Sequence, residues 1–282
     1  MKTKNIIFVI SAIFLFLIFP SITSAHQPRL VKEVKTTVVD PEISKAYYAK
    51  LEKTSNTYTI QSDTDFNLYV NILVPKIENQ KKDVSFSITK DGKELATYLA
   101  EDHEWKEFWE EFGRNWYWMG AEYREKATPG TYEITVWSSQ NDSKYSLAIG
   151  EIETFDSKES MNALKLIPEI KKNFFEESPI TFLLSPFGWS YILILFVLSF
   201  IFGFLYRFIL KKFSKKSQGR GSKNINKKDR YLRFGFGIAL FILAITTSWS
   251  PYLFFFSGFC FFEAIFSWCG FYAAIGKRSC PL

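Results

Sequence analysis

Hydrophobic and polar positions partly alternate through much of the first half of the chain. In residues 66–74, 84–88, 131–136 and 144–149 this alternation is accompanied by many β-branched and aromatic side chains. Such a pattern is typical of short β-strands with one buried face. Several such strands, separated by turn signals, predict an all-β fold for residues 26–155, an antiparallel, jelly-roll-like sandwich.

The dipeptide Asp91-Gly92 lies between two of these apolar runs, 84–88 and 95–99. Asp-Gly is favoured in tight hairpin turns, because both central residues of the turn adopt positive φ. The sequence therefore predicts that the two runs form a β-hairpin.

The stretch 101–123 follows a different period and is rich in aromatic residues. Four of them recur at i, i+3, i+4 and i+7, which predicts one stripe of a short helix ending at Gly113: Trp105, Phe108, Trp109 and Phe112. Trp116, Tyr117 and Trp118 then follow in a predicted loop. Either the stripe covers an open end of the sandwich, or the three loop residues stay partly exposed and stack on a sugar, a peptide or a lipid headgroup.

Residues 156–186 turn to helical spacing and connect the predicted sandwich to a long apolar run. Asp156 and Glu159 have the spacing of a capping pair, and apolar residues follow at three- and four-residue steps through 161–174. Pro168 interrupts the pattern and is expected either to kink the helix or to begin a second one. The segment is interpreted as a juxtamembrane helical connector.

Three apolar runs follow and predict an α-helical membrane region with three spans. The first, 187–210, contains only Arg207 as a charged residue, and about 20 apolar residues are enough to cross the hydrocarbon core. The second and third, within 234–275, are separated by Ser250-Pro251 and are expected to form a two-span hairpin.

The N-terminal residues 1–25 have the composition of a signal peptide. Lys2 and Lys4 precede the apolar run 6–19, and small residues lead up to Ala25, after which cleavage is expected. The alternative is an uncleaved N-terminal anchor.

Charge predicts the orientation of the chain. The loop 211–233 holds ten Lys and Arg residues against the single acid Asp229, an excess that is typical of cytoplasmic loops. We therefore expect a multi-pass protein of a prokaryotic plasma membrane, with the N-terminal domain extracytoplasmic and the tail 276–282 cytoplasmic. Because residues 26–186 are net acidic, the overall charge of +6 reflects this orientation, and no nucleic-acid partner is expected.

One acid and two bases of the C-terminal part are candidate functional residues. Glu263 is the acid of an otherwise apolar span, and intramembrane acids are costly to bury. It is either a functional group or a helix-packing contact, for example to Ser257 or to a serine or threonine of the neighbouring span. Arg230 and Arg233 are expected to contact lipid phosphate at the membrane surface.

All three cysteines, Cys260, Cys269 and Cys280, lie after the basic loop. The predicted exported domain therefore contains no disulfide and depends on its core alone. Cys269 and Cys280 are a possible redox or sulfur-relay pair on the cytoplasmic side. Their spacing matches no recognised redox motif, and ordinary buried small residues are the alternative.

Catalytic signatures are missing from the sequence. No phosphate-binding loop, catalytic triad or zinc-type cluster can be assembled, and the histidines are His26 and His103. The acidic turn 101–104 around His103 lacks metal-ligand spacing. We expect no catalytic residue, no metal ion, no cofactor and no enzymatic activity.

Two segments resemble known families. The runs 129–136 (PGTYEITV) and 144–150 (KYSLAIG) resemble the closing hairpin of prepeptidase C-terminal β-sandwich domains. This resemblance implies a non-catalytic accessory or binding module.

The runs 226–237 (NKKDRYLRFGFG) and 268–276 (WCGFYAAIG) resemble the DUF2892 family, which includes YgaP-like inner-membrane proteins. The resemblance implies a two-span membrane hairpin that can form a homodimer. The sequence departs from the family at Gly270, where the family usually has proline, and it contains no rhodanese active-site loop, which puts any sulfur-transfer role in doubt.

Three hypotheses follow. The preferred one is a non-enzymatic membrane protein whose extracytoplasmic sandwich binds a small ligand or a protein partner, while its spans contact membrane lipids. The second is a redox or sulfur-handling component that uses the cysteines. The third is a transport accessory in which Glu263 lines a path between protomers.

Overall fold

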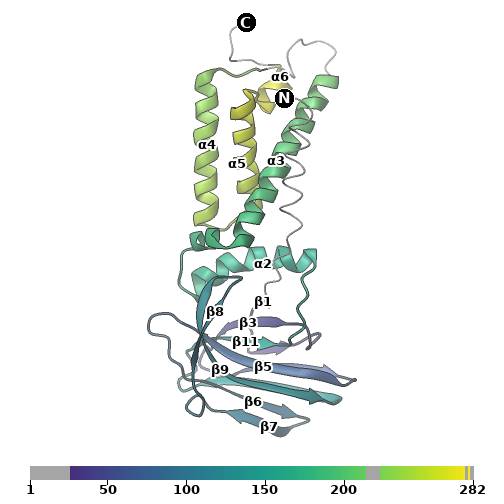
Figure 1. The fold of residues 1–282 in the computed structure, drawn as a ribbon, viewed down its shortest axis with the longest axis vertical. Helices are drawn as coiled ribbons and strands as arrows, with labels where there is room; N and C mark the ends of the chain where they lie inside the picture. Colours follow the sequence, from purple (N-terminus) through teal and green to yellow (C-terminus); the bar gives the residue numbers. More distant parts are fainter. Residues whose placement is uncertain (1–25, 214–222, 277–278, 280–282) are drawn as a thin grey trace.

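The computed structural model describes residues 26–213, 223–276 and Ser279. A β-sandwich occupies one end of the molecule and a group of helices the other, as Figure 1 shows. The predicted signal peptide, Cys280 and much of the basic loop lie outside the described residues.

Two sheets form the sandwich. The six-stranded sheet has the order β1-β3-β11-β5-β9-β8, and the five-stranded sheet has the order β2-β4-β10-β6-β7. The strands are β1 (Gln27–Leu30), β2 (Lys35–Thr37), β3 (Lys45–Lys50), β4 (Asn56–Ser62), β5 (Phe66–Pro75), β6 (Val84–Lys90), β7 (Lys93–Tyr98), β8 (Lys106–Glu110), β9 (Asn115–Ala127), β10 (Gly130–Ser138) and β11 (Lys144–Ile149).

The predicted sandwich is thus present, but its pairing is not wholly antiparallel. At one edge of each sheet a short N-terminal strand runs parallel to its neighbour, β1 with β3 and β2 with β4. β1 joins the six-stranded sheet and β2 the five-stranded sheet. β3 and β4 then follow in the same two sheets, each running parallel to the earlier strand beside it.

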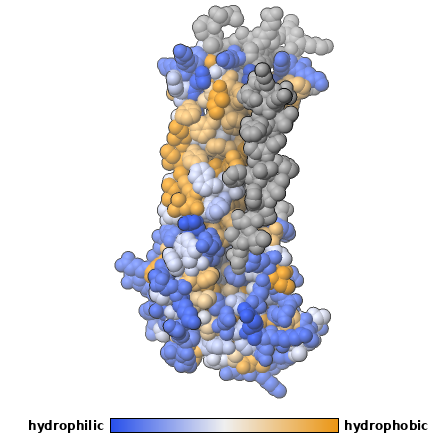
Figure 2. Space-filling model, in the orientation of Figure 1, coloured by the Kyte–Doolittle hydropathy of each residue, from blue (hydrophilic) through white to orange (hydrophobic). Residues whose placement is uncertain are grey.

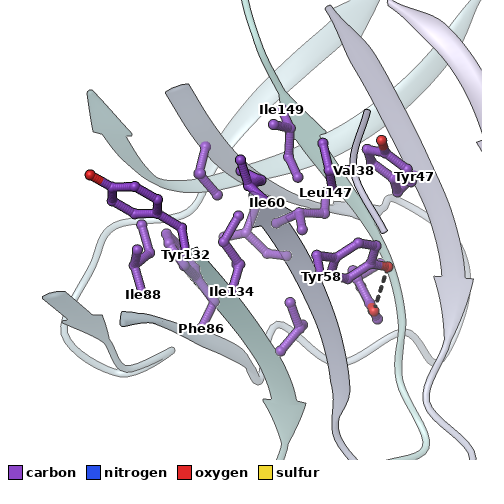
Figure 3. Close-up of a cluster of buried hydrophobic side chains, with 14 of the residues drawn as sticks. Val38, Tyr47, Tyr58, Ile60, Phe86, Ile88, Tyr132, Ile134, Leu147 and Ile149 are labelled. Carbon is purple, nitrogen blue, oxygen red and sulfur yellow. Dashed lines mark hydrogen bonds between the residues drawn. The ribbon is translucent and has the colours of Figure 1, made fainter. Parts of the chain in front are cut away.

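The core lies between the two sheets and follows the alternation in the sequence. Ile134 and Val136 of β10 are completely buried, and Ile134 lies opposite Tyr58 on the neighbouring strand β4. Figure 3 shows this cluster, in which the Tyr58 hydroxyl also bonds the hydroxyl of Tyr145 (2.9 Å). Burial of each large apolar side chain contributes about 1.5–3 kcal/mol.

The hairpin predicted at Asp91-Gly92 is present between β6 and β7. Asp91 and Gly92 adopt φ of 48° and 77°. Both central residues therefore have the positive φ that a two-residue hairpin turn requires.

The helix predicted within 101–123 is wrong. The segment forms the β8–β9 hairpin, which turns at Arg114 with a φ of 55°. β9 pairs with β5 along most of its length, so hydrogen bonds to a distant strand replace the local helical bonds that the aromatic spacing favours. In a strand, successive side chains point to opposite faces, and the predicted aromatic stripe is split between them.

The connector has the predicted helical form. Helix α2 (Ser157–Glu169) begins where the Asp156 carboxylate accepts a hydrogen bond from the Glu159 N–H (2.7 Å). It continues past Pro168 into a wider turn, η1 (Ile170–Phe174), and a 3-10 helix, η2 (Pro179–Leu184), follows. The connector packs on the outer face of the six-stranded sheet through Ile170, Phe174 and Phe175.

The remaining helices stand beyond the connector, with α5 in contact with both α3 and α4. They are α3 (Pro186–Phe213), α4 (Lys227–Thr246), α5 (Pro251–Phe266) and the short α6 (Gly270–Ile275). Among the described residues, one helix, 186–212, is long and apolar enough to cross a membrane, and few residues of its most apolar part are buried. Figure 2 shows hydrophobic residues along the helical part and hydrophilic residues over the sandwich and the opposite end.

The second apolar run of the predicted hairpin, after Ser250-Pro251, was expected to form one helix. It forms two, α5 and α6. α5 ends at Phe266, and Ser267 adopts a left-handed conformation with a φ of 53°. The chain then turns through Trp268 and Cys269 into α6. The apolar composition of the run concealed this break, because neither proline nor glycine marks Ser267.

Candidate functional site

The β8–β9 hairpin carries an aromatic and cationic face that we call the tryptophan surface, formed by Trp109, Trp116, Trp118, Lys76 and Lys82. Trp109 and Trp116 lie opposite each other on the two strands, with ring centroids 5.1 Å apart. Lys76 lies 4.9 Å from the Trp118 ring centroid, and Lys82 lies 4.1 Å from it. Trp116 is 47% exposed, so this face presents an accessible aromatic edge beside positive charge.

Tyr117 does not belong to this surface, contrary to the sequence interpretation. It points to the opposite side of β9, is 3% exposed, and packs edge-on against Phe175 of the connector. Its hydroxyl lies 3.1 Å from that of Tyr48. Trp118 is also only partly available, because it packs against the sandwich core. Of the three residues predicted to bind a ligand, Trp116 is the exposed one.

A second feature, missed in the sequence analysis, lies on the outer face of the six-stranded sheet. We call it the tyrosine groove, a depression of about 260 Å³. Its floor is made of small residues and its walls of aromatic ones: Ser44, Ala46, Ser146, Ala148, Tyr48, Tyr69 and Tyr117. Small residues recur at every second position, at 44 and 46 and again at 146 and 148, which was the available sequence signal, but only the pairing of β3 with β11 brings these segments together.

A buried polar cluster adjoins the groove under the connector. The Glu110 carboxylate accepts hydrogen bonds from the N–H groups of Phe112 (2.6 Å) and Gly113 (2.7 Å), and burial raises its pKa. Lys171 donates to the Asn115 side-chain oxygen (3.0 Å), and burial lowers the pKa of this lysine. A cavity of about 30 Å³ lies beside these groups, enough for a single water molecule.

The tip of the β8–β9 hairpin joins the sandwich to the helices. The Phe112 ring lies 4.1 Å from that of Phe187 at the start of α3, and the Ser185 hydroxyl donates to the Phe112 carbonyl (3.1 Å). Beside this contact, Trp249 from the α4–α5 turn is buried and donates its indole N–H to the Pro179 carbonyl (3.0 Å). The sandwich thus rests directly on one end of the helical region.

Glu263 has partners that the sequence analysis did not propose. Its carboxylate accepts a hydrogen bond from Arg233 Nε (3.0 Å) and another from the Gly270 N–H at the start of α6 (2.7 Å). Ser257, the suggested partner, instead donates to the Gly237 carbonyl (2.8 Å). Glu263 therefore links α4, α5 and α6. Its suggested role in transport stays a prediction.

The two arginines expected at lipid phosphate also have partners within the chain. Arg233 bonds Glu263, and Arg230 Nε donates to the Ala264 carbonyl (2.8 Å) while its residue stays exposed. Their contact with lipid stays a prediction.

Cys269 occupies a structural position at the start of α6. Its backbone exchanges two hydrogen bonds with the Asn224 side chain (2.7 and 2.9 Å), and its sulfur accepts one from the Tyr272 N–H (3.4 Å). Because Cys280 lies outside the described residues, the proposed thiol pair stays a prediction. Within the described ranges, no group of three or more His, Cys, Asp or Glu residues is placed to hold a metal ion.

The C-terminal region matches a known family. Residues 222–282 match the family model described as "Inner membrane protein YgaP-like, transmembrane domain". The resemblance noted at 226–237 and 268–276 is therefore confirmed: this segment is similar to the YgaP-like transmembrane domain, which indicates a membrane location. No curated protein matches the chain.

Solved structures similar to the sandwich have low identity. One is the pre-peptidase C-terminal domain of a collagenase from Bacillus anthracis (8% identity, 45% of this chain, 95% of that chain, TM-score 0.25). A second is the catalytic domain of a GH87 alpha-1,3-glucanase in complex with nigerose (12% identity, 39% of this chain, 22% of that chain, TM-score 0.21). A third is the EclA C-terminal domain, a sugar-binding protein (18% identity, 39% of this chain, 77% of that chain, TM-score 0.19). This chain covers about a fifth of the glucanase domain. TM-scores of this size carry no inference about fold or function.

Proposed function

We propose that the chain is a non-enzymatic protein of a prokaryotic plasma membrane, which holds an extracytoplasmic β-sandwich against the bilayer and binds an outside partner through the tryptophan surface. The observation that carries this proposal is the docking of Phe112 against Phe187. It fixes the sandwich at one end of the helices, with the tryptophan surface on the same hairpin.

Charge supports the orientation. The end of α3 and the start of α4, at the far end from the sandwich in Figure 1, carry Lys211, Lys212, Lys227 and Lys228. Because cytoplasmic ends of spans are enriched in such residues, the sandwich belongs on the extracytoplasmic side and the C-terminus in the cytoplasm.

The proposed spans are α3, α4 and α5. α5 has 16 residues and reaches about 24 Å at 1.5 Å per residue, which is short for a hydrocarbon core of about 30 Å. Local thinning of the bilayer accommodates such a helix at modest cost. A homodimer through the hairpin remains compatible with this arrangement.

The chemistry of the tryptophan surface suggests the kind of ligand. An exposed indole such as that of Trp116 offers a flat apolar face for a sugar ring. Lys76 lies 5.6 Å from the Trp116 ring centroid and also pairs with Glu107 (2.5 Å), and Lys82 lies over the neighbouring Trp118 ring. These two lysines supply positive charge for a carboxylate. An acidic oligosaccharide satisfies both requirements.

The test uses the full chain in lipid nanodiscs and isothermal titration calorimetry with oligogalacturonate. We expect saturable binding that Trp116→Ala weakens at least tenfold and that neutral oligosaccharides do not reproduce. Leu95→Ala is the matched control, because Leu95 is an equally exposed apolar residue of the sandwich, at 46%. Absence of binding, or equal effects of the two variants, contradicts the tryptophan surface as the site.

A further inference from the structure

The tyrosine groove has the shape of a built binding site. On the outer face of the six-stranded sheet, β11 places Ala148 beside Ala46 of β3. Ser146 of β11 and Ser44, just before β3, line the same depression. Larger residues at these positions would fill the depression, as the connector fills the neighbouring part of the same face.

The walls of the groove suit a positively charged guest. Tyr48 and Tyr69 supply half-buried aromatic rings, whose faces attract cations. Glu153 supplies an exposed carboxylate, and among the described residues that line the groove there is no lysine or arginine. Glu110 also lines the groove, but it is largely buried and both of its oxygens accept backbone hydrogen bonds. The neighbouring cations lie outside this lining, Lys171 in the adjoining recess and Arg124 at the rim.

The remaining titratable groups of the groove add no net positive charge to its lining. His26 bonds the Ser44 hydroxyl, and burial lowers its pKa, so it is neutral at pH 7. Glu151 pairs with Arg124 at the rim (2.7 Å), and Arg124 itself stacks over the Tyr69 ring at 5.1 Å. The Arg124 guanidinium therefore already covers one face of the Tyr69 ring.

An independent observation indicates that the recess at the groove's end holds a polar atom. The Asn115 side-chain nitrogen is buried and has no hydrogen-bond partner within the part of the chain that the structure describes. It lies at the cavity of about 30 Å³, which shares His26, Tyr48, Glu110 and Tyr117 with the groove. A buried amide donor without an acceptor is costly, so this cavity suits a water molecule or a hydroxyl group of a ligand.

We propose that the tyrosine groove binds a small organic cation, an alkylammonium group that lies against the rings of Tyr48 and Tyr69 with Glu153 as its counter-ion. This site is on the opposite side of β9 from the tryptophan surface, and it goes beyond the proposed function because the two sites can operate independently.

The experiment is calorimetric titration of the full chain in nanodiscs with tetramethylammonium and n-propylammonium. Propionate and tert-butanol serve as the anionic and neutral counterparts. We expect saturable binding of the ammonium probes with a Kd on the order of 1 mM, as for a single ammonium group held by weak contacts, and no saturable binding of the counterparts.

Three variants make the site assignment falsifiable. Glu153→Gln and Tyr69→Leu are each expected to weaken ammonium binding about tenfold, whereas Glu133→Gln, an exposed acid on the five-stranded sheet, leaves it unchanged. Glu153 is exposed, so its substitution removes no core contact. Tyr69 is half-buried and packs against the apolar cluster under the connector, and leucine keeps an apolar side chain at this position. Failure of both ammonium probes to bind, equal binding of propionate, or equal weakening by all three variants overturns the proposal. Ammonium binding that survives Trp116→Ala separates this site from the tryptophan surface.

Discussion

Removal of the Phe112 ring is predicted to release the sandwich from the helices while leaving the sandwich folded. Phe112 is 7% exposed and contacts Phe155 and Phe187, with ring centroids 5.8 and 4.1 Å away. Replacing a buried phenylalanine by alanine costs about 3–5 kcal/mol. We take the lower figure, about 3 kcal/mol, because a hairpin tip can relax into the space, and this corresponds to about a hundredfold change in the docking equilibrium.

Hydrogen exchange of the full chain in nanodiscs measures this effect. In Phe112→Ala, amides of the tip, residues 111–114, are expected to exchange at least tenfold faster, and those of β4 and β10 in the sandwich core at an unchanged rate. Trp116→Ala is the matched control, an aromatic residue of the same hairpin that is largely exposed. Equal protection of the tip in the two variants would refute the reasoning, and faster exchange throughout the sandwich would show that Phe112 stabilises the fold rather than the docking.

Three further predictions concern stability. Arg233→Leu and Glu263→Gln each break a largely buried ion pair, and each is expected to lower the free energy of unfolding by about 3 kcal/mol. In thermal unfolding, the double variant should lose much less stability than the sum of the two single variants. Additive losses would exclude the pairing. Gly258→Val is expected to separate α3 from α5 and lower the melting temperature, because a Cβ at Gly258 would lie 2.3 Å from the Ser199 hydroxyl oxygen of α3. Gly235→Val is the control, because a Cβ there meets no atom within 4 Å. Equal melting temperatures of the two variants would contradict this packing. Because burial raises the pKa of Glu110, the folded state retains its proton to higher pH than the unfolded state, so stability should fall as pH rises from about 4.5 through the raised value. Glu110→Gln should flatten that slope, and an unchanged pH profile would show that Glu110 does not cause it.

Local patterns predicted the sandwich because they coincide with its tertiary contacts. The buried positions of β10 alternate in the sequence as they do in the core, and the Asp91-Gly92 turn requires only two neighbouring residues. The aromatic spacing of 101–113 misled the prediction, because pairing of β9 with β5 is a contact between distant segments that no local period reveals.

The candidate sites depended on such distant contacts as well. Arg233 and Glu263 are 30 residues apart, and their pairing depends on how α4 packs against α5. The floor of the tyrosine groove combines Ala46 with Ala148, which adjacent strands bring together from opposite ends of the sandwich domain. The membrane region was predictable because apolar length and the family resemblance are both properties of a continuous segment.

The central claim, an extracytoplasmic sandwich docked on the membrane helices, is tested most directly by cysteine labelling in intact cells. Serine replaces Cys260, Cys269 and Cys280, and a single cysteine is then introduced as Glu94→Cys in the sandwich or as Lys228→Cys at the start of α4, both exposed positions. A membrane-impermeant maleimide is predicted to label the Glu94→Cys protein in intact cells and the Lys228→Cys protein only after permeabilisation. Labelling in the reverse order would place the sandwich in the cytoplasm and contradict the account.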